Sequence, residues 1–134
     1  MFEWLKKNRS SPSLPSPLTG APAVRRQKTY SAQSGYVYQY FYNGLRRVGE
    51  STEYVFEVSA DRKAGLPVSV FLPDASVAHW ARNHCRELAA QERYGVVKMA
   101  LFQAFDERPD PASMNAPVEI QPGEMESLAG ALDL

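Results

Sequence analysis

Cysteine and histidine are scarce: the 134 residues include one cysteine, Cys85, and two histidines. A single cysteine cannot form an internal disulfide and is a poor start for a zinc site. His79 and His84 are five residues apart, so on a helix they do not share one face. We therefore expect no metal site and no cofactor.

Long apolar runs and net charge are also missing. No apolar stretch approaches the ~20 residues that cross a bilayer, and Lys plus Arg equals Asp plus Glu at 15 each. Whole-chain charge therefore does not attract nucleic acid or an anionic surface. The basic start is followed by Ser10–Pro17, where a secretory signal needs an apolar stretch. Together with the lone cysteine, this predicts a cytoplasmic protein.

Charge and proline divide the chain into three regions. Residues 1–27 hold five basic residues and one acidic residue, residues 28–108 ten and nine, and residues 109–134 five acidic and no basic residues. Each terminal region also contains four of the ten prolines, whereas thirteen of the fifteen aromatic residues lie between Tyr30 and Phe105. Because aromatic side chains supply most of the buried area, we expect one folded domain at 28–108 between a basic Pro/Ser-rich tail and an acidic tail.

Two stretches, at 35–42 and 52–59, alternate with a period of two residues and predict strands, and a short apolar stretch at 67–72 predicts a third. Asn43-Gly44 follows the first of them and indicates a hairpin turn, because both residues tolerate positive φ. The sequence LRRVGE after this turn is either the start of a return strand, which would be a fourth, or a loop.

The period changes after Asp74. Val77, Trp80, Ala81 and Leu88 recur at helical steps and predict a helix over 75–88. Good helix formers predict a second helix over 91–107, which Pro109 stops. A strand at 96–102 is the alternative.

This order predicts an α+β fold: a small two-layer domain with a three-stranded, or four-stranded, antiparallel sheet followed by two helices. Flexible tails would flank the domain. The pattern does not resemble a particular family, and it indicates no oligomeric state.

The most informative feature is a row of tyrosines at alternate positions of the first strand. Tyr36, Tyr38, Tyr40 and Tyr42 project from one face. If this face is open, it is an aromatic surface that could stack bases or sugar rings, with Arg46 and Arg47 contacting phosphate. The alternatives are that the helices pack on this face, or that it binds a protein. The near-neutral middle region argues against nucleic acid.

Both tails have apolar ends. Phe2 and Trp4 precede Lys6, Lys7 and Arg9, as in a docking peptide or a peripheral membrane contact through residues 1–9. Near the other end, Met125, Leu128, Ala129 and Leu132 have helical spacing, which fits a short docking helix or a frayed terminus.

Catalytic motifs are absent. The sequence contains neither the G-x-S-x-G motif of serine hydrolases nor the glycine-rich loops that hold nucleotide phosphates. We therefore expect a small non-enzymatic module that binds another protein. The alternative is binding of single-stranded nucleic acid or glycan through the tyrosine face.

Overall fold

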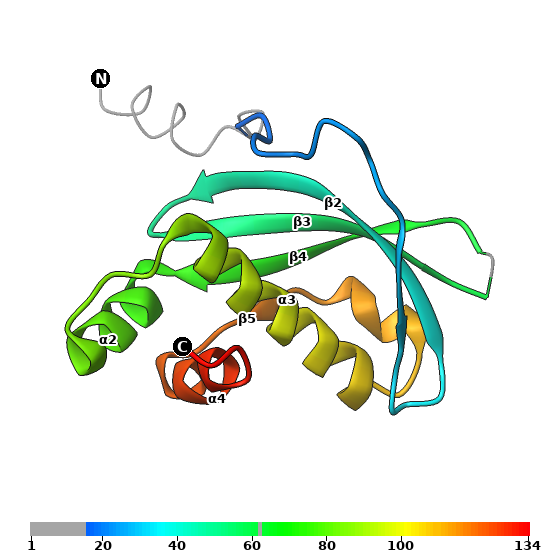
Figure 1. Cartoon of the computed structure of the whole chain (residues 1–134). Coiled ribbons are helices and arrows are strands. Elements are labelled where there is room, and N and C mark those ends of the chain that lie inside the picture. Colours follow the sequence, from blue (N-terminus) through cyan, green and yellow to red (C-terminus); the bar gives the residue numbers. More distant parts are fainter. Residues whose placement is uncertain (1–15, 62) are drawn as a thin grey trace, which may run out of the picture.

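The computed structural model describes residues 16–61 and 63–134. In these ranges the chain forms a curled sheet of five strands, in the order β1-β2-β3-β4-β5, with helices on one face (Figure 1). Neighbouring strands are antiparallel except β5, which runs parallel to β4. The bounds are β1 Lys28–Ser31, β2 Val37–Val48, β3 Ser51–Ala60, β4 Leu66–Pro73 and β5 Val118–Glu119.

The α+β class is confirmed, but the expected three- or four-stranded antiparallel sheet is wrong. The two additional strands, β1 and β5, have only four and two residues. Strands this short carry no readable alternation, and backbone pairing with β2 and β4 holds them in place. β5 also joins the sheet after the helices, which an antiparallel meander does not predict.

The hairpin expected at Asn43-Gly44 is wrong as well. β2 continues through both residues to Val48, with a register shift between Tyr42 and Gly44, and the chain turns at Gly49 instead. Gly44 has a φ of +119°, and a Cβ there would lie 2.6 Å from the carbonyl oxygen of Thr19. The glycine therefore serves a bulge and a close backbone approach.

Helices occur close to where helical spacing predicts them. α2 is Asp74–His84 and ends earlier than expected, because Cys85 adopts the left-handed conformation with a φ of 54°. α3 is Ala90–Glu107, so the alternative of a strand at 96–102 is wrong. Three further short elements follow: η1 Pro111–Asn115, η2 Pro122–Glu124 and α4 Met125–Gly130.

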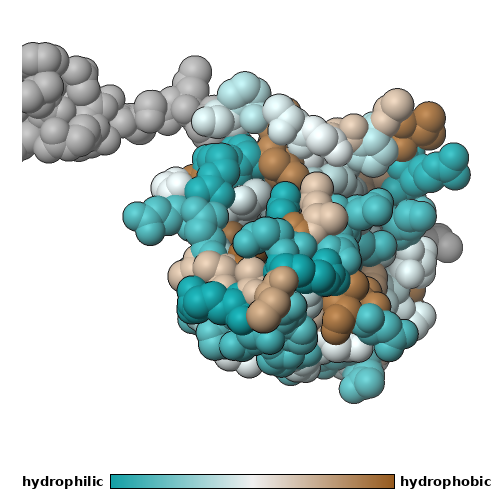
Figure 2. Space-filling model, turned by 60° about the vertical axis from the view of Figure 1, so that its left-hand side comes forward, coloured by the Kyte–Doolittle hydropathy of each residue, from teal (hydrophilic) through white to brown (hydrophobic). Residues whose placement is uncertain are grey.

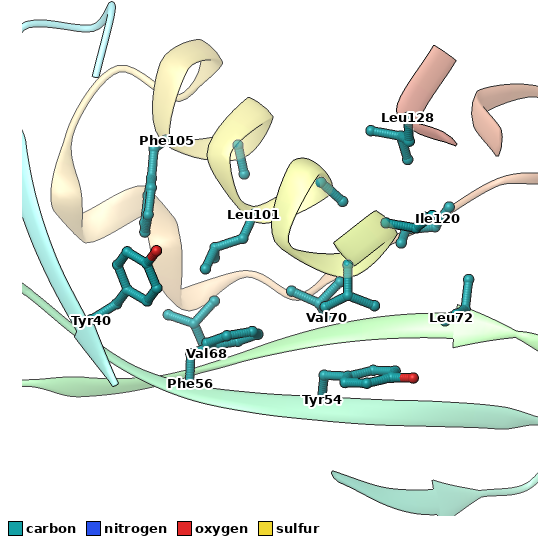
Figure 3. Close-up of a cluster of buried hydrophobic side chains, with 14 of the residues drawn as sticks. Tyr40, Tyr54, Phe56, Val68, Val70, Leu72, Leu101, Phe105, Ile120 and Leu128 are labelled. Carbon is teal, nitrogen blue, oxygen red and sulfur yellow. The ribbon is translucent and has the colours of Figure 1, made fainter. Parts of the chain in front are cut away.

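The core lies between α3 and the sheet (Figure 3). Phe105 and Leu101 reach down from α3 toward Tyr40, Phe56 and Val68 on the strands. These side chains are at most 4% exposed. Each Å² of apolar surface that this layer removes from water stabilises the fold by ~25 cal/mol.

The C-terminal region 109–134 is part of the fold, which corrects the expected acidic tail. Its buried side chains are Met114, Ile120, Met125, Leu128 and Ala129, each at most 5% exposed. Composition alone predicted a tail because this region is rich in acidic residues and proline. Its charged side chains are exposed or half-buried, whereas apolar residues between them are buried, and in α4 these have helical spacing. The spaced apolar residues of α4 therefore dock onto their own domain.

Two contacts fix this region. The hydroxyl of Ser76 on α2 donates to the carbonyl oxygen of Ile120 at 2.7 Å, in a buried position. Gly95 in α3 lies against Leu132, whose Cδ1 would be 2.9 Å from a Cβ at that position. A glycine in the first turns of a helix is therefore explained by close packing of the C-terminus.

The N-terminal stretch before β1 follows the sheet on its outer side (Figure 1). Thr19 and Leu45 exchange two backbone hydrogen bonds, of 2.9 and 2.8 Å. The guanidinium of Arg25 lies 3.9 Å from the ring centre of Phe41 and pairs with Glu57 at 2.7 Å. Residues 16–27 thus contact the sheet while most of them remain exposed.

Met125→Ala tests whether the C-terminal region supports the core. Met125 is fully buried, so the truncation should lower the free energy of unfolding by about 2–5 kcal/mol. Ser127→Ala on the exposed side of α4 is the control and should change it by less than about 0.5 kcal/mol. Both are read from chemical denaturation. Equal stability of the two variants would mean that α4 does not hold the core.

Candidate functional site

The tyrosine row faces the helices, and its middle is closed. Tyr38 and Tyr40 are 0% and 4% exposed. The ring of Tyr38 stacks on Phe105 with centres 4.1 Å apart and planes 9° apart. Tyr40 meets Phe102 edge to face, and the half-buried Tyr42 contacts Tyr94 at 4.7 Å. Tyr38 and Tyr40 are therefore core residues, unavailable for stacking bases or sugars.

The two arginines are engaged in ion pairs. The Nε of Arg46 lies 2.7 Å from a carboxylate oxygen of Glu53, on the sheet face away from the helices. Burial alone would raise the pKa of Glu53, but hydrogen bonds from Arg46 and Ser69 outweigh it and hold this pKa below its ordinary value. Arg47 donates two hydrogen bonds to Asp74, at 2.7 and 2.6 Å.

The predicted site residues are thus only partly brought together. Arg46 and Arg47 lie on different faces of β2, and their guanidinium groups pair with Glu53 and Asp74. Phe2 and Trp4, and with them the expected docking or membrane contact through residues 1–9, lie outside the described residues. Tyr36 and Tyr38 remain, and both line one cavity.

This cavity has a volume of about 360 Å³ and lies where the sheet extends past the end of α3. The β3–β4 turn borders it on one side and η1 on the other. The wall is mostly apolar and includes Tyr36, Tyr38, Val58, Leu66, Pro111 and Ala112. The charged residues of the lining are Asp61, Lys63 and Asp110. A small, largely apolar cavity with a few polar groups is the usual form of a binding site.

The hydroxyl of Tyr38 is the unusual group in this wall. It is buried and has no hydrogen-bond partner among the described residues. Burial raises the pKa of Tyr38, the neighbouring Tyr36, Asp110 and Asp61 raise it further, and the charge of Arg108 lowers it. Asp110 and Asp61 line the same cavity as Tyr38. Buried polar groups are normally satisfied, so an orphan hydroxyl calls for an explanation.

A second cavity, of about 440 Å³, is lined by residues of β2, β3, the first half of α2 and the region around the start of α3. Three of its four charged groups are already engaged, since Arg47 pairs with Asp74 and Arg93 donates to the carbonyl oxygen of Leu88 at 2.6 Å. Figure 2 shows a side of the molecule that is mostly hydrophilic, with separate small apolar areas. The cavity beside Tyr36 and Tyr38 is therefore the stronger candidate.

The described parts of the chain hold no group of side chains arranged to bind a metal ion or to activate a nucleophile. No three His, Cys, Asp or Glu side chains come together there to hold a metal ion. His84 pairs with Glu126 at 2.9 Å and stacks on Trp80, and Cys85 is exposed at the end of α2. None of the described helices has the length and apolar character to span a bilayer.

Comparison with models of protein families, with curated proteins and with solved structures finds no match.

Sequence reasoning found Tyr36 and Tyr38 but missed the two aspartates. Asp61 lies in a polar turn, and its φ of 55° is a left-handed conformation that only the structure reveals. Asp110 follows Pro109 in the region taken as a tail. Because the two are far apart in sequence and meet only through folding, no local pattern could have joined them.

Alkaline pH should unfold the protein through its buried tyrosines. Burial is the main cause that raises the pKa of Tyr94 to about 12, and it also raises those of Tyr40 and Tyr42. In the unfolded chain a phenol ionises near about pH 10. The resulting stability is therefore fully present below about pH 10 and is lost as pH rises toward about 12.

Tyrosinate absorbance and far-UV circular dichroism, recorded together from neutral to alkaline pH, should show ionisation coupled to unfolding. Tyr94→Phe should weaken the alkaline loss of stability. Ionisation of all tyrosines near about pH 10 in a chain that stays folded would contradict the burial of these hydroxyls.

Tyr38→Phe should stabilise the free protein. It removes a buried hydroxyl that has no partner and keeps the stack on Phe105, so we expect a gain of about 1 kcal/mol in the free energy of unfolding. Tyr30→Phe is the matched control. It deletes a hydroxyl that donates to Asp106 at 2.8 Å, so it should lose about 1 kcal/mol. A loss of stability in both variants would show that the Tyr38 hydroxyl has a partner.

Proposed function

We propose that this protein is a small non-enzymatic module that binds another protein by taking one of its side chains into the cavity beside Tyr36 and Tyr38. The observation that carries the proposal is the orphan hydroxyl of Tyr38 in the wall of a largely apolar cavity. A bound group that supplies a hydrogen-bond partner would relieve the cost of that burial, about 1–3 kcal/mol.

The size of the cavity supports a side chain as the occupant. Its volume of about 360 Å³ is near the lower end of the range for small-molecule sites, roughly 300–1,000 Å³. One anchoring side chain in a desolvated pocket often supplies much of the affinity of a protein interface. The exposed residues around the β3–β4 turn would then form the rim of the interface.

The described residues offer less support for the alternative, binding of nucleic acid or glycan to the tyrosine face. Helix α3 covers Tyr38 and Tyr40, and Arg46 and Arg47 are paired with carboxylates. The exposed thiol of Cys85, the only cysteine, supports a reducing compartment, and we place the protein in the cytoplasm within this proposal.

Peptide display tests the proposal. A library of random peptides is selected on the full-length protein, and the selected peptides are then measured against two variants that fill the cavity, Ala64→Trp and Ala112→Trp. Both alanines line the cavity and are exposed. Ala23→Trp, at an exposed position away from it, is the control. Affinity should fall at least about tenfold for both filled variants and stay unchanged for the control.

Peptides that bind the filled variants as tightly as the unmodified protein would place the interface elsewhere. Failure to select any peptide would contradict the proposal that the cavity receives a side chain.

A further inference from the structure

Two carboxylates from distant segments meet at this cavity. Asp61 follows β3, and Asp110 is the N-cap residue of η1. Both line the cavity, and both act on the hydroxyl of Tyr38 through their charge. Hence two carboxylates and one tyrosine belong to the lining of the same cavity.

These carboxylates have unused hydrogen-bonding capacity. The Oδ1 atom of Asp110 accepts from the backbone nitrogen and the hydroxyl of Ser113, at 3.0 and 2.8 Å. Its Oδ2 atom, and both carboxylate oxygens of Asp61, have no partner among residues 16–61 and 63–134. Acceptors gathered in this way favour an occupant that is rich in N–H donors.

Two cations lie near these carboxylates, and the charge of Arg108 lowers the pKa of Tyr38 where the carboxylates raise it. Lys63 also lines the cavity, but its ammonium lies farther than 4 Å from either carboxylate, since no ion pair joins them within the described residues. The guanidinium of Arg108 donates instead to the backbone carbonyl oxygens of Ser113, Ala116 and Pro117. The lining charges among the described residues are thus two negative and one positive, which disfavours an anionic occupant.

We propose that the occupant of the cavity is a lysine side chain of the partner protein, with its ammonium group at Asp61, Asp110 and the hydroxyl of Tyr38. The ammonium has three N–H donors, one for each of these three side chains. The four methylene groups of lysine suit the apolar wall formed by Val58, Leu66 and Pro111. This inference rests on the proposed function and adds the chemistry of the occupant.

Three short capped peptides of the form Gly-X-Gly distinguish the chemistry, with X as lysine, norleucine or Nε-acetyl-lysine. Norleucine keeps the hydrocarbon stem without the charge, and acetyl-lysine keeps the nitrogen as a neutral amide. Each is titrated into the full-length protein and followed by backbone amide shifts in ¹H–¹⁵N spectra. We expect the lysine peptide to shift amides at 58–61 and 110–112, with at least about tenfold higher affinity than the two neutral peptides.

Matched variants identify the carboxylates. Asp61→Asn with Asp110→Asn removes both charges and leaves an oxygen that can still accept from Ser113. This double variant should abolish the preference for lysine. Asp133→Asn, an exposed residue near the C-terminus with a φ of 61°, should keep it, because asparagine tolerates that conformation.

The outcomes separate this inference from the proposed function. If the norleucine peptide shifts the same amides with equal affinity, the lysine assignment is overturned while side-chain binding stands. If no peptide shifts these amides and display also selects none, the proposed function itself fails. If butylammonium binds as tightly as the lysine peptide, the cavity is a site for a free amine and the protein-partner assignment is overturned.

Discussion

The contact between Tyr38 and Phe105 holds together the two layers of the fold. Phe105 lies in the last turn of α3, and its ring covers the ring of Tyr38 in the middle of the tyrosine row. A strand and a helix with aromatic faces bury large areas only when they pack directly on each other, so this stack determines which face of the sheet the helix covers. The C-terminal elements then pack on α3, and the cavity remains where the helix ends and the sheet continues.

The position of Tyr38 also explains why a polar atom is buried there. The ring belongs to the core, and the buried hydroxyl has no hydrogen-bond partner among the described residues. A phenylalanine would fit the ring contacts equally well. A residue that lowers stability without serving the packing is typical of a place where binding matters more than stability.

Sequence patterns predicted the strands and helices that bury one face, because burial of one face gives the apolar residues a regular spacing. The alternating tyrosines of β2 and the spaced apolar residues of α3 are examples. What could not be predicted depended on contacts between distant segments. Gly44 resembles a hairpin residue locally, but the approach of Thr19 makes it part of a bulge. The C-terminal region was misjudged because proline and acidic residues dominate its composition, although the few apolar residues between them fill the core.

In the candidate site, Tyr36 and Tyr38 were predictable from alternation, whereas Asp61 and Asp110 were not.

The short outer strands have a consequence for behaviour at high concentration. Unpaired strand edges can recruit other chains into continuous sheets. Here β1 covers only the first part of the free side of β2, and Thr19 pairs with Leu45 farther along the same side. On the opposite side, β5 pairs with Val70 and Phe71 of β4. The long, apolar central strands are thus shielded by short segments, and the exposed edge strand β1 begins with a lysine. This arrangement protects a sheet rich in tyrosine and phenylalanine against self-association and amyloid-like stacking.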